Sequence, residues 1–182
     1  MSAYEERIVR TVEAFRRNRY DVSRFAERTA AADYLAAEIR GKRVGFGDSE
    51  TLRALSLYER LSVHNEVIDP PRAGHVGGIE AFLAAGREAL MTDVFVLSAN
   101  AITEEGQILN MDGAGNRVAG SLFGHEKTYF VVGINKLVPD IEAGIARIHE
   151  IAAPRNAHRK GKKTPCAKDG TRCYDCAALE RI

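Results

Sequence analysis

The six residues DVFVLS, at positions 93–98, are the stretch that decides the fold of this chain. Between the terminal Asp and Ser they are continuously apolar, without the alternation of polar and apolar side chains that marks a half-exposed strand. Such a run predicts a strand buried on both faces in the middle of a parallel sheet. The run KTYFVVGI, at 127–134, predicts a second strand of the same kind.

Weaker patterns on either side of these two runs predict the remaining elements. Apolar residues at helical spacing predict helices, and short β-rich runs predict strands. The predicted helices cover 4–18, 27–39, 52–61, 79–90, 116–123 and 139–152, and the further strands cover 20–25, 43–47, 64–69 and 107–111. A Gly-containing loop is expected at 72–78. This alternation predicts an α/β fold with a Rossmann-like, mostly parallel sheet and helices on both faces.

Length and composition describe an ordinary globular protein. The chain has 182 residues, 45% of them hydrophobic and 28% charged, with a formal net charge of +1. A net charge so close to zero produces no overall electrostatic field that would attract nucleic acid or an anionic membrane, so neither is an expected partner. The charged N-terminus is unlike a signal peptide, and no apolar run approaches the roughly 20 residues of a membrane span, which predicts a cytoplasmic protein.

The organisation expected along the chain is one α/β domain over residues 1–155 and a tail over 156–182. The composition changes near Pro154, where the sequence PRNAHRKGKKT becomes basic and loses its apolar face. We interpret this stretch as a linker or a solvated basic segment, because short basic runs are usually solvated rather than bound to nucleic acid.

In parallel α/β sheets ligands bind at the carboxyl ends of the strands, so we expect functional residues in the segments that follow the strands. The first is GFGDSET, at 45–51, in which glycines follow a strand and hydroxyl residues precede a helix. Free N–H groups at a helix start favour an anion. The alternative is a tight turn with Asp48 or Ser49 as an N-cap, which requires no ligand.

The second segment runs from Ser98 to Arg117 and is dense in Asn, Asp, Glu, Thr and Gly. Long polar loops on a rigid scaffold often carry function. Asp112 and Gly113 would also suit a hairpin turn, so a structural explanation exists for individual residues. The third segment is Gly133-Ile134-Asn135-Lys136, where the Lys could hold a carboxylate or phosphate or could simply be solvated.

Three cysteines, Cys166, Cys173 and Cys176, lie within the last seventeen residues of the chain. The Cys-x2-Cys spacing suits a zinc ion, and three thiolates also suit an iron–sulfur cluster with one open iron. A fourth ligand could come from His158, Asp169, Asp175 or water. The alternatives are a tail with reduced thiols and a redox pair formed by Cys173 and Cys176.

The motif AITEEGQILNMDGAGNR, at 101–117, followed by GINK at 133–136, resembles the LUD-domain (lactate-utilisation) family. Upstream, VGFGDSETLRALSLYERL at 44–61 resembles the family's Gly-x-Ser-x-Thr-Leu segment, and TPCAKDGTRCYDC at 164–176 resembles the Cys-bearing tail of its short-chain branch. The resemblance covers about residues 4–182. It implies a fold of the sugar-isomerase/CoA-transferase superfamily, with an added hairpin and a ligand crevice.

The resemblance also implies a set of crevice residues and a general function. The ligand-binding candidates are Gly47, Ser49, Thr51, Asn100, Gly106, Asn116, Arg117, Asn135 and Lys136, and the catalytic candidates are Glu104 and Asp112. The implied ligand is a small anionic metabolite or cofactor, and the implied partners are iron–sulfur oxidoreductase subunits, with a homo-oligomer also compatible. The alternative is a non-catalytic accessory or sensor protein whose cysteine tail binds zinc or an iron–sulfur cluster. The reaction and the enzymatic status stay open.

Overall fold

The computed structural model describes residues 2–180, which divide into two compact units. The sheet unit comprises residues 23–98 and 114–132, and the hairpin unit comprises residues 2–22, 99–113 and 133–180. This division does not test the predicted boundary after residue 155, which stays a prediction. None of the helices within residues 2–180 is long and apolar enough to cross a membrane.

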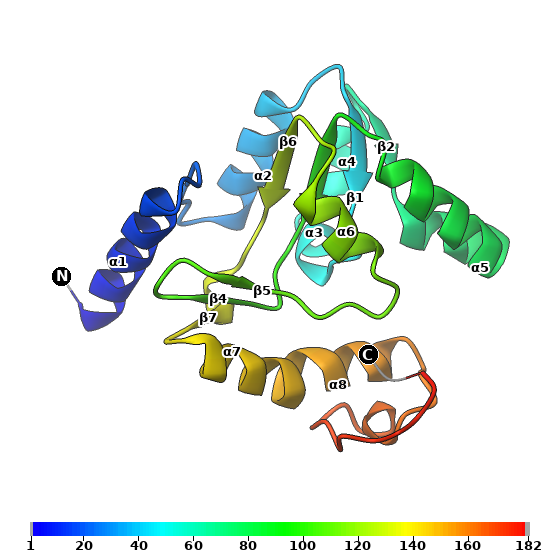
Figure 1. Ribbon diagram of the computed structural model, residues 1–182. Coiled ribbons are helices and arrows are strands. Elements are labelled where there is room, and N and C mark those ends of the chain that lie inside the picture. The colour runs from blue at the N-terminus through cyan, green and yellow to red at the C-terminus, as the bar shows by residue number, and fades with distance from the viewer. Residues whose placement is uncertain (1, 181–182) are drawn as a thin grey trace. The chain divides into compact units, whose positions relative to one another are not determined.

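The sheet unit is built on four parallel strands (Figure 1) in the order β2-β1-β3-β6. These are β1 (Arg43–Phe46), β2 (Glu66–Ile68), β3 (Val94–Leu97) and β6 (Lys127–Phe130). Strand β3 is buried at all four positions and pairs with β1 on one side and β6 on the other. The run at 93–98 is therefore a central parallel strand, as its composition predicts.

Helices cover both faces of this sheet because successive side chains of a strand point to opposite faces. On one face, Val44, Phe46, Val94 and Val96 form a core with apolar residues of three helices. These helices are α2 (Arg28–Glu38), α3 (Glu50–Ala54) and α4 (Leu57–Leu61). On the other face, Phe95 and Leu97 pack with α5 (Pro70–Ala89), and Phe95 also meets α6 (Asn116–Leu122). The predicted α/β class with a Rossmann-like sheet is confirmed.

The hairpin unit contains a three-stranded sheet in the order β5-β4-β7. Strand β4 (Ala101–Thr103) is antiparallel to β5 (Ile108–Leu109) and parallel to β7 (Leu137–Val138). The helices of this unit are α1 (Ala3–Arg17), α7 (Ile141–Arg147), α8 (Ala153–Arg159), the π segment η2 (Ile148–Ala152) and the short 3-10 helices η1 (Ile134–Lys136) and η3 (Pro165–Ala167).

Four local predictions are wrong. Residues 20–25 form no strand. Residues 72–78 lie inside α5 rather than in a loop, with non-helical backbone confined to Gly77 and Gly78, because Asp69 caps the helix and Pro70 starts it. The helix expected over 52–61 is split by Ser56, which has a φ of 49°. Strands β4 and β7 have no counterpart among the predicted elements.

The basic stretch after Pro154 is also more ordered than its composition suggests. Helix α8 runs from Ala153 to Arg159, so the start of the expected linker is helical. Pro154 and Ala157 are buried, and α8 packs against η3, which contains the buried Cys166. The apolar contact between α8 and η3 thus orders a segment whose composition predicts a solvated linker.

Candidate functional site

The sheet unit has a topological switch point between β1 and β3. From β1 the chain crosses through α3 and α4 to β2 on one side, and from β2 it returns through α5 to β3 on the other side of β1. The connections therefore leave the carboxyl ends of β1 and β3 in opposite directions. In open α/β sheets this arrangement places a ligand crevice beyond those strand ends.

Gly47, directly after β1, lies at this switch point in tight contact with its neighbours. Its N–H donates to the carbonyl oxygen of Val96 at 2.9 Å. A Cβ at this position would lie 2.8 Å from Cγ of Arg117 and 2.9 Å from Cβ of Leu97. Only a glycine leaves room for this approach, which brings the stem of Arg117, in the first turn of α6, to the end of β1.

The hydroxyl groups beside Gly47 have defined structural roles. Ser49 caps α3, since its Oγ accepts from the N–H groups of Thr51 at 3.1 Å and Leu52 at 3.4 Å. The turn with an N-cap, considered from the sequence, is therefore present. Ser98, after β3, is 1% exposed, and its Oγ donates to Oγ1 of Thr51 at 3.3 Å. This bond ties the ends of β1 and β3 together.

The charges next to these hydroxyls form a paired network. Asp48 lies 2.5 Å from the guanidinium of Arg53, which also pairs with Glu50. Asp69, after β2, is mostly buried, and this burial raises the pKa of its carboxyl above the ordinary value. The Arg72 backbone N–H and the charges of Arg53 and Arg72 oppose that rise without cancelling it.

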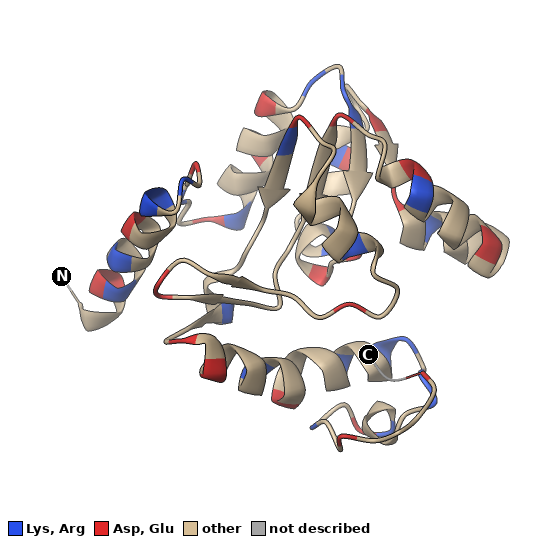
Figure 2. Ribbon diagram, viewed as in Figure 1, with Lys and Arg blue, Asp and Glu red and all other residues tan. Residues whose placement is uncertain are grey.

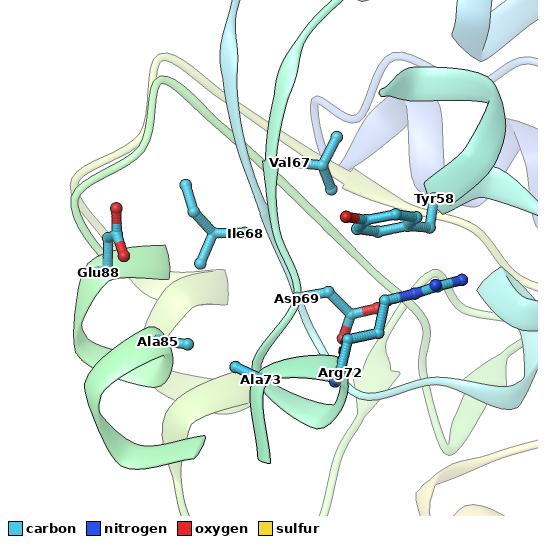
Figure 3. A pocket seen from close by; sticks show the side chains of 8 residues that line it. All are labelled: Tyr58, Val67, Ile68, Asp69, Arg72, Ala73, Ala85 and Glu88. Carbon is cyan, nitrogen blue, oxygen red and sulfur yellow. Dashed lines mark hydrogen bonds and ion pairs between the residues drawn. The ribbon is translucent and has the colours of Figure 1, made fainter. Parts of the chain in front are cut away.

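A shallow pocket of about 240 Å³ lies beside the edge strand β2 (Figure 3). Figure 3 shows Arg72 running alongside Tyr58 and Asp69. The guanidinium carbon of Arg72 is 3.8 Å from the Tyr58 ring centre, and the side chain pairs with Glu59 and, at 3.5 Å, with Asp69. The cation in this pocket already pairs with two carboxylates, which weakens the pocket as an anion site.

In the hairpin unit, Glu104 and Gly106 hold helix α1. The Glu104 carboxylate lies 2.5 Å from Nε of Arg7 and 3.7 Å from Arg10. Gly106 has a φ of 80°, and a Cβ there would lie 2.8 Å from the backbone of Ala14 in α1. Both residues therefore have a packing role. The catalytic role of Glu104 stays a prediction.

Asn100 and Lys136 both form hydrogen bonds around the start of β4 in the hairpin unit. The Oδ1 of Asn100 accepts from the Met111 N–H at 2.7 Å, and Nζ of Lys136 donates to the carbonyl oxygen of Ala99 at 2.9 Å. Arg147, from α7, donates to the carbonyl oxygen of Asn100. Two cations thus bind successive carbonyl groups of one segment.

The three remaining candidates lie in separate elements. Asp112 follows β5 and is half-buried, Asn135 is exposed in η1, and Asn116 is the first residue of α6. Their ligand-binding and catalytic roles stay predictions.

The three cysteines of the tail are not gathered into one set of ligands. Cys166 is buried beside the Thr164 hydroxyl, while Cys173 and Cys176 are half-buried, and none of the three is in a disulfide. Within residues 2–180, no group of three or more His, Cys, Asp or Glu side chains could hold a metal ion. As the thiols are arranged, they do not fit the predicted zinc ion or iron–sulfur cluster.

Sequence reasoning singled out neither Asp69 nor Arg147, which the structure places among charged groups. Asp69 precedes two prolines and reads as the end of a strand, whereas β2 ends at Ile68 and Asp69 caps α5. Arg147 reads as one polar position of an amphipathic helix. The only signal at Asp69 is an acidic residue at the end of a predicted strand, and Arg147 carries no local signal.

A parallel sheet with helices on both faces and polar loops at its switch point defines a Rossmann-like α/β protein. The chain belongs to the LUD domain family, a family related to lactate utilisation, whose model matches residues 8–178. No curated protein and no solved structure matches the chain.

Proposed function

We propose that the chain binds a small anionic metabolite or cofactor at the switch point of the sheet unit, in organic-acid metabolism of the lactate-utilisation type. The observation that supports this most directly is the close approach of Arg117 to Gly47 at the end of β1. A guanidinium is always charged and presents five donors in a planar fork that matches carboxylate and phosphate groups.

The surroundings of Arg117 suit an oriented anion. Thr51 and Ser98 form a hydroxyl pair between the two strand ends, and the Ser49 hydroxyl, which accepts two N–H groups, still has its own proton to donate. Neutral donors of this kind fix the orientation of a ligand whose charge an arginine balances. Membership of a family related to lactate utilisation supports an organic acid as the ligand class.

The candidates in the hairpin unit remain proposals beside this one. They are Asn100, Glu104, Gly106, Asp112, Asn135 and Lys136. Partnership with iron–sulfur oxidoreductase subunits and a homo-oligomeric state also remain proposals, which affinity measurement with such subunits and sedimentation analysis would test.

The proposal is tested by ligand binding to the full chain and to two arginine variants. Thermal-shift measurements with lactate, pyruvate, CoA esters and sugar phosphates at millimolar concentration identify a ligand, and calorimetry then gives its affinity. Arg117→Gln should weaken binding by roughly 10- to 100-fold, because a hydrogen bond to a charged group contributes about 1.5–3 kcal/mol. Arg87→Gln, an exposed arginine of α5 in the same unit, removes the same charge and should leave affinity within about twofold.

Two results would count against the proposal. One is a folded protein that responds to none of these ligands. The other is an Arg117→Gln variant that binds as tightly as the parent chain while its melting temperature is unchanged.

A further inference from the structure

The loop that follows α8 in the hairpin unit is ordered by hydrogen bonds at both of its ends. Gly161, which has a φ of 58°, donates its N–H to the carbonyl oxygen of His158 at 3.0 Å. The Lys162 N–H donates to the carbonyl oxygen of Ala157, also at 3.0 Å. This pair of bonds is the Schellman arrangement that ends a helix at a glycine. At the other end of the loop, Nδ1 of His158 donates to the carbonyl oxygen of Ala167 in η3 at 2.8 Å.

Three lysines of this loop line one open hollow. Lys162, Lys163 and Lys168 border a space of about 450 Å³, called here the lysine hollow. Pro165 and Ala167 also line this space and provide apolar surface. Figure 2 shows basic residues on the loop after α8. Because ligand sites for small molecules typically measure about 300–1,000 Å³, the lysine hollow is large enough for a small ligand.

The three ammonium groups of the lysine hollow have no acidic partner in the part of the chain that the structure describes. Within residues 2–180, none of them forms an ion pair with a carboxylate, unlike the ammonium groups of Lys42 and Lys127. Lys162 is half-buried, whereas Lys163 and Lys168 are exposed. Like charges gathered in one place repel each other, and an anion bound among them would replace this repulsion with attraction.

A carboxylate of the chain itself binds to the backbone of the same loop. The N–H of Lys163 donates to Oε2 of Glu180 at 2.9 Å. A hydrogen bond to a carboxylate is charge-assisted, so it is stronger than one to a neutral oxygen. The loop that carries the three lysines therefore also presents a backbone donor to negative charge.

We propose that Lys162, Lys163 and Lys168 bind a diphosphate or triphosphate group in the lysine hollow. A lysine ammonium binds phosphate as a point charge, while the two oxygens of a carboxylate are matched by the planar fork of an arginine. The described residues that line the hollow include no arginine. Three cations suit a ligand with several negative charges, and the apolar surface of Pro165 and Ala167 can contact an organic part. The site is proposed in addition to the one in the sheet unit.

The test is calorimetric titration of the full chain with pyrophosphate, ADP and citrate at low ionic strength, in buffer without divalent cations. Citrate is the ligand control, because it carries several negative charges on carboxylates alone. Pyrophosphate or ADP should bind at least about tenfold more tightly than citrate, since lysine point charges suit phosphoryl oxygens. Tighter binding of ADP would identify an esterified ligand that uses the apolar surface, and tighter binding of pyrophosphate would identify a free one.

Substitutions then locate the binding site. Lys162→Gln, Lys163→Gln and Lys168→Gln should each weaken pyrophosphate binding roughly three- to tenfold, and the triple variant should weaken it at least about 30-fold, because partly exposed charges contribute modestly one by one. Arg17→Gln is the matched control, since it removes an exposed arginine at the end of α1 in the same unit. This control should change affinity by less than about twofold.

Four outcomes would overturn this proposal. They are no heat with millimolar pyrophosphate or ADP, citrate binding as tight as that of both phosphates, an Arg17→Gln variant that loses as much affinity as the lysine variants, and weaker pyrophosphate binding by Glu180→Gln. The last variant removes the carboxylate charge next to the Lys163 N–H and should bind pyrophosphate at least as tightly as the parent chain. Circular dichroism verifies that each variant is folded. If the triple variant fails to fold, the single variants at Lys163 and Lys168, which are exposed, decide the question.

Discussion

Replacing Gly45 by alanine should destabilise the sheet unit strongly. Gly45 is the third residue of β1, and a Cβ there would lie 2.4 Å from the Ala89 carbonyl oxygen, 2.8 Å from Oγ1 of Thr92 and 2.9 Å from the Phe95 ring. Real Cβ atoms essentially never approach other heavy atoms within 3.0 Å. The three neighbours are all buried, at 1%, 3% and 0% exposure, so none can move into solvent.

The expected cost follows from the number and kind of these contacts. Overpacking a core typically costs about 1–3 kcal/mol, and more when the contacted atom is backbone and cannot change rotamer. With one backbone contact and two side-chain contacts, we expect the free energy of unfolding to fall by about 3 kcal/mol. For a chain of this length that corresponds to a melting temperature lower by roughly 6–12 °C.

Gly86→Ala in α5 is the matched control. The nearest atom to its added Cβ would be Cβ of Asn116 at 3.9 Å, an ordinary contact. Alanine is favoured over glycine inside a helix by about 1 kcal/mol, so this variant should be neutral or stabilising. Urea unfolding measures both, as a change in midpoint at constant slope. A Gly45→Ala midpoint equal to that of Gly86→Ala would refute the packing argument.

Three other perturbations have defined outcomes. Burial raises the folded-state pKa of Asp69 above its ordinary value of 3.8, so the stability that the protonated Asp69 contributes is complete below pH 3.8 and is lost as pH rises through the folded-state pKa. Asp69→Asn should remove this decrease from the free energy of unfolding measured at a series of pH values, and an unchanged slope would contradict the prediction. Glu104→Gln should lower the free energy of unfolding, measured in urea, by roughly 1 kcal/mol, because it weakens the partly exposed pair with Arg7. A variant that keeps this stability but no longer turns over a ligand would instead favour a catalytic role. Gly106→Ala combines a φ of 80° with a 2.8 Å approach to α1, so it should lower stability by about 2 kcal/mol, whereas a neutral effect in the same assay would show that α1 can shift.

Much of the sheet unit could be predicted from sequence because its signals are local. A continuous apolar run flanked by polar residues is buried on both faces wherever it is placed, so β3 is recognisable without its neighbours. The N-cap at Ser49 and the helix that begins at Asn116 are similarly local. Among the elements that were missed, β4 and the first half of α5 have weak local signals: β4 is three residues long, and α5 contains the pair Gly77 and Gly78.

The candidate site was only partly predictable for the same reason. Gly47, Thr51 and Arg117 were identified through family motifs, but their spacing along the chain does not reveal that a Cβ at Gly47 would strike Arg117. Glu104 was a catalytic candidate through the family resemblance, and the structure pairs it with Arg7 and Arg10 of α1. Contacts between residues some hundred positions apart are set by packing and leave no periodic signal.

The sequence by itself determined the α/β class, the central strand and membership of the LUD domain family, because burial pattern and motif spacing are properties of short segments. Only the tertiary structure decided the strand order, the switch point beside Gly47 and the arrangement of the three tail thiols, which do not form one ligand set. These features depend on which surfaces meet when the helices cover the sheet and when α8 packs on η3. These tertiary contacts minimise the exposed apolar area of each whole unit, so no local sequence pattern encodes them.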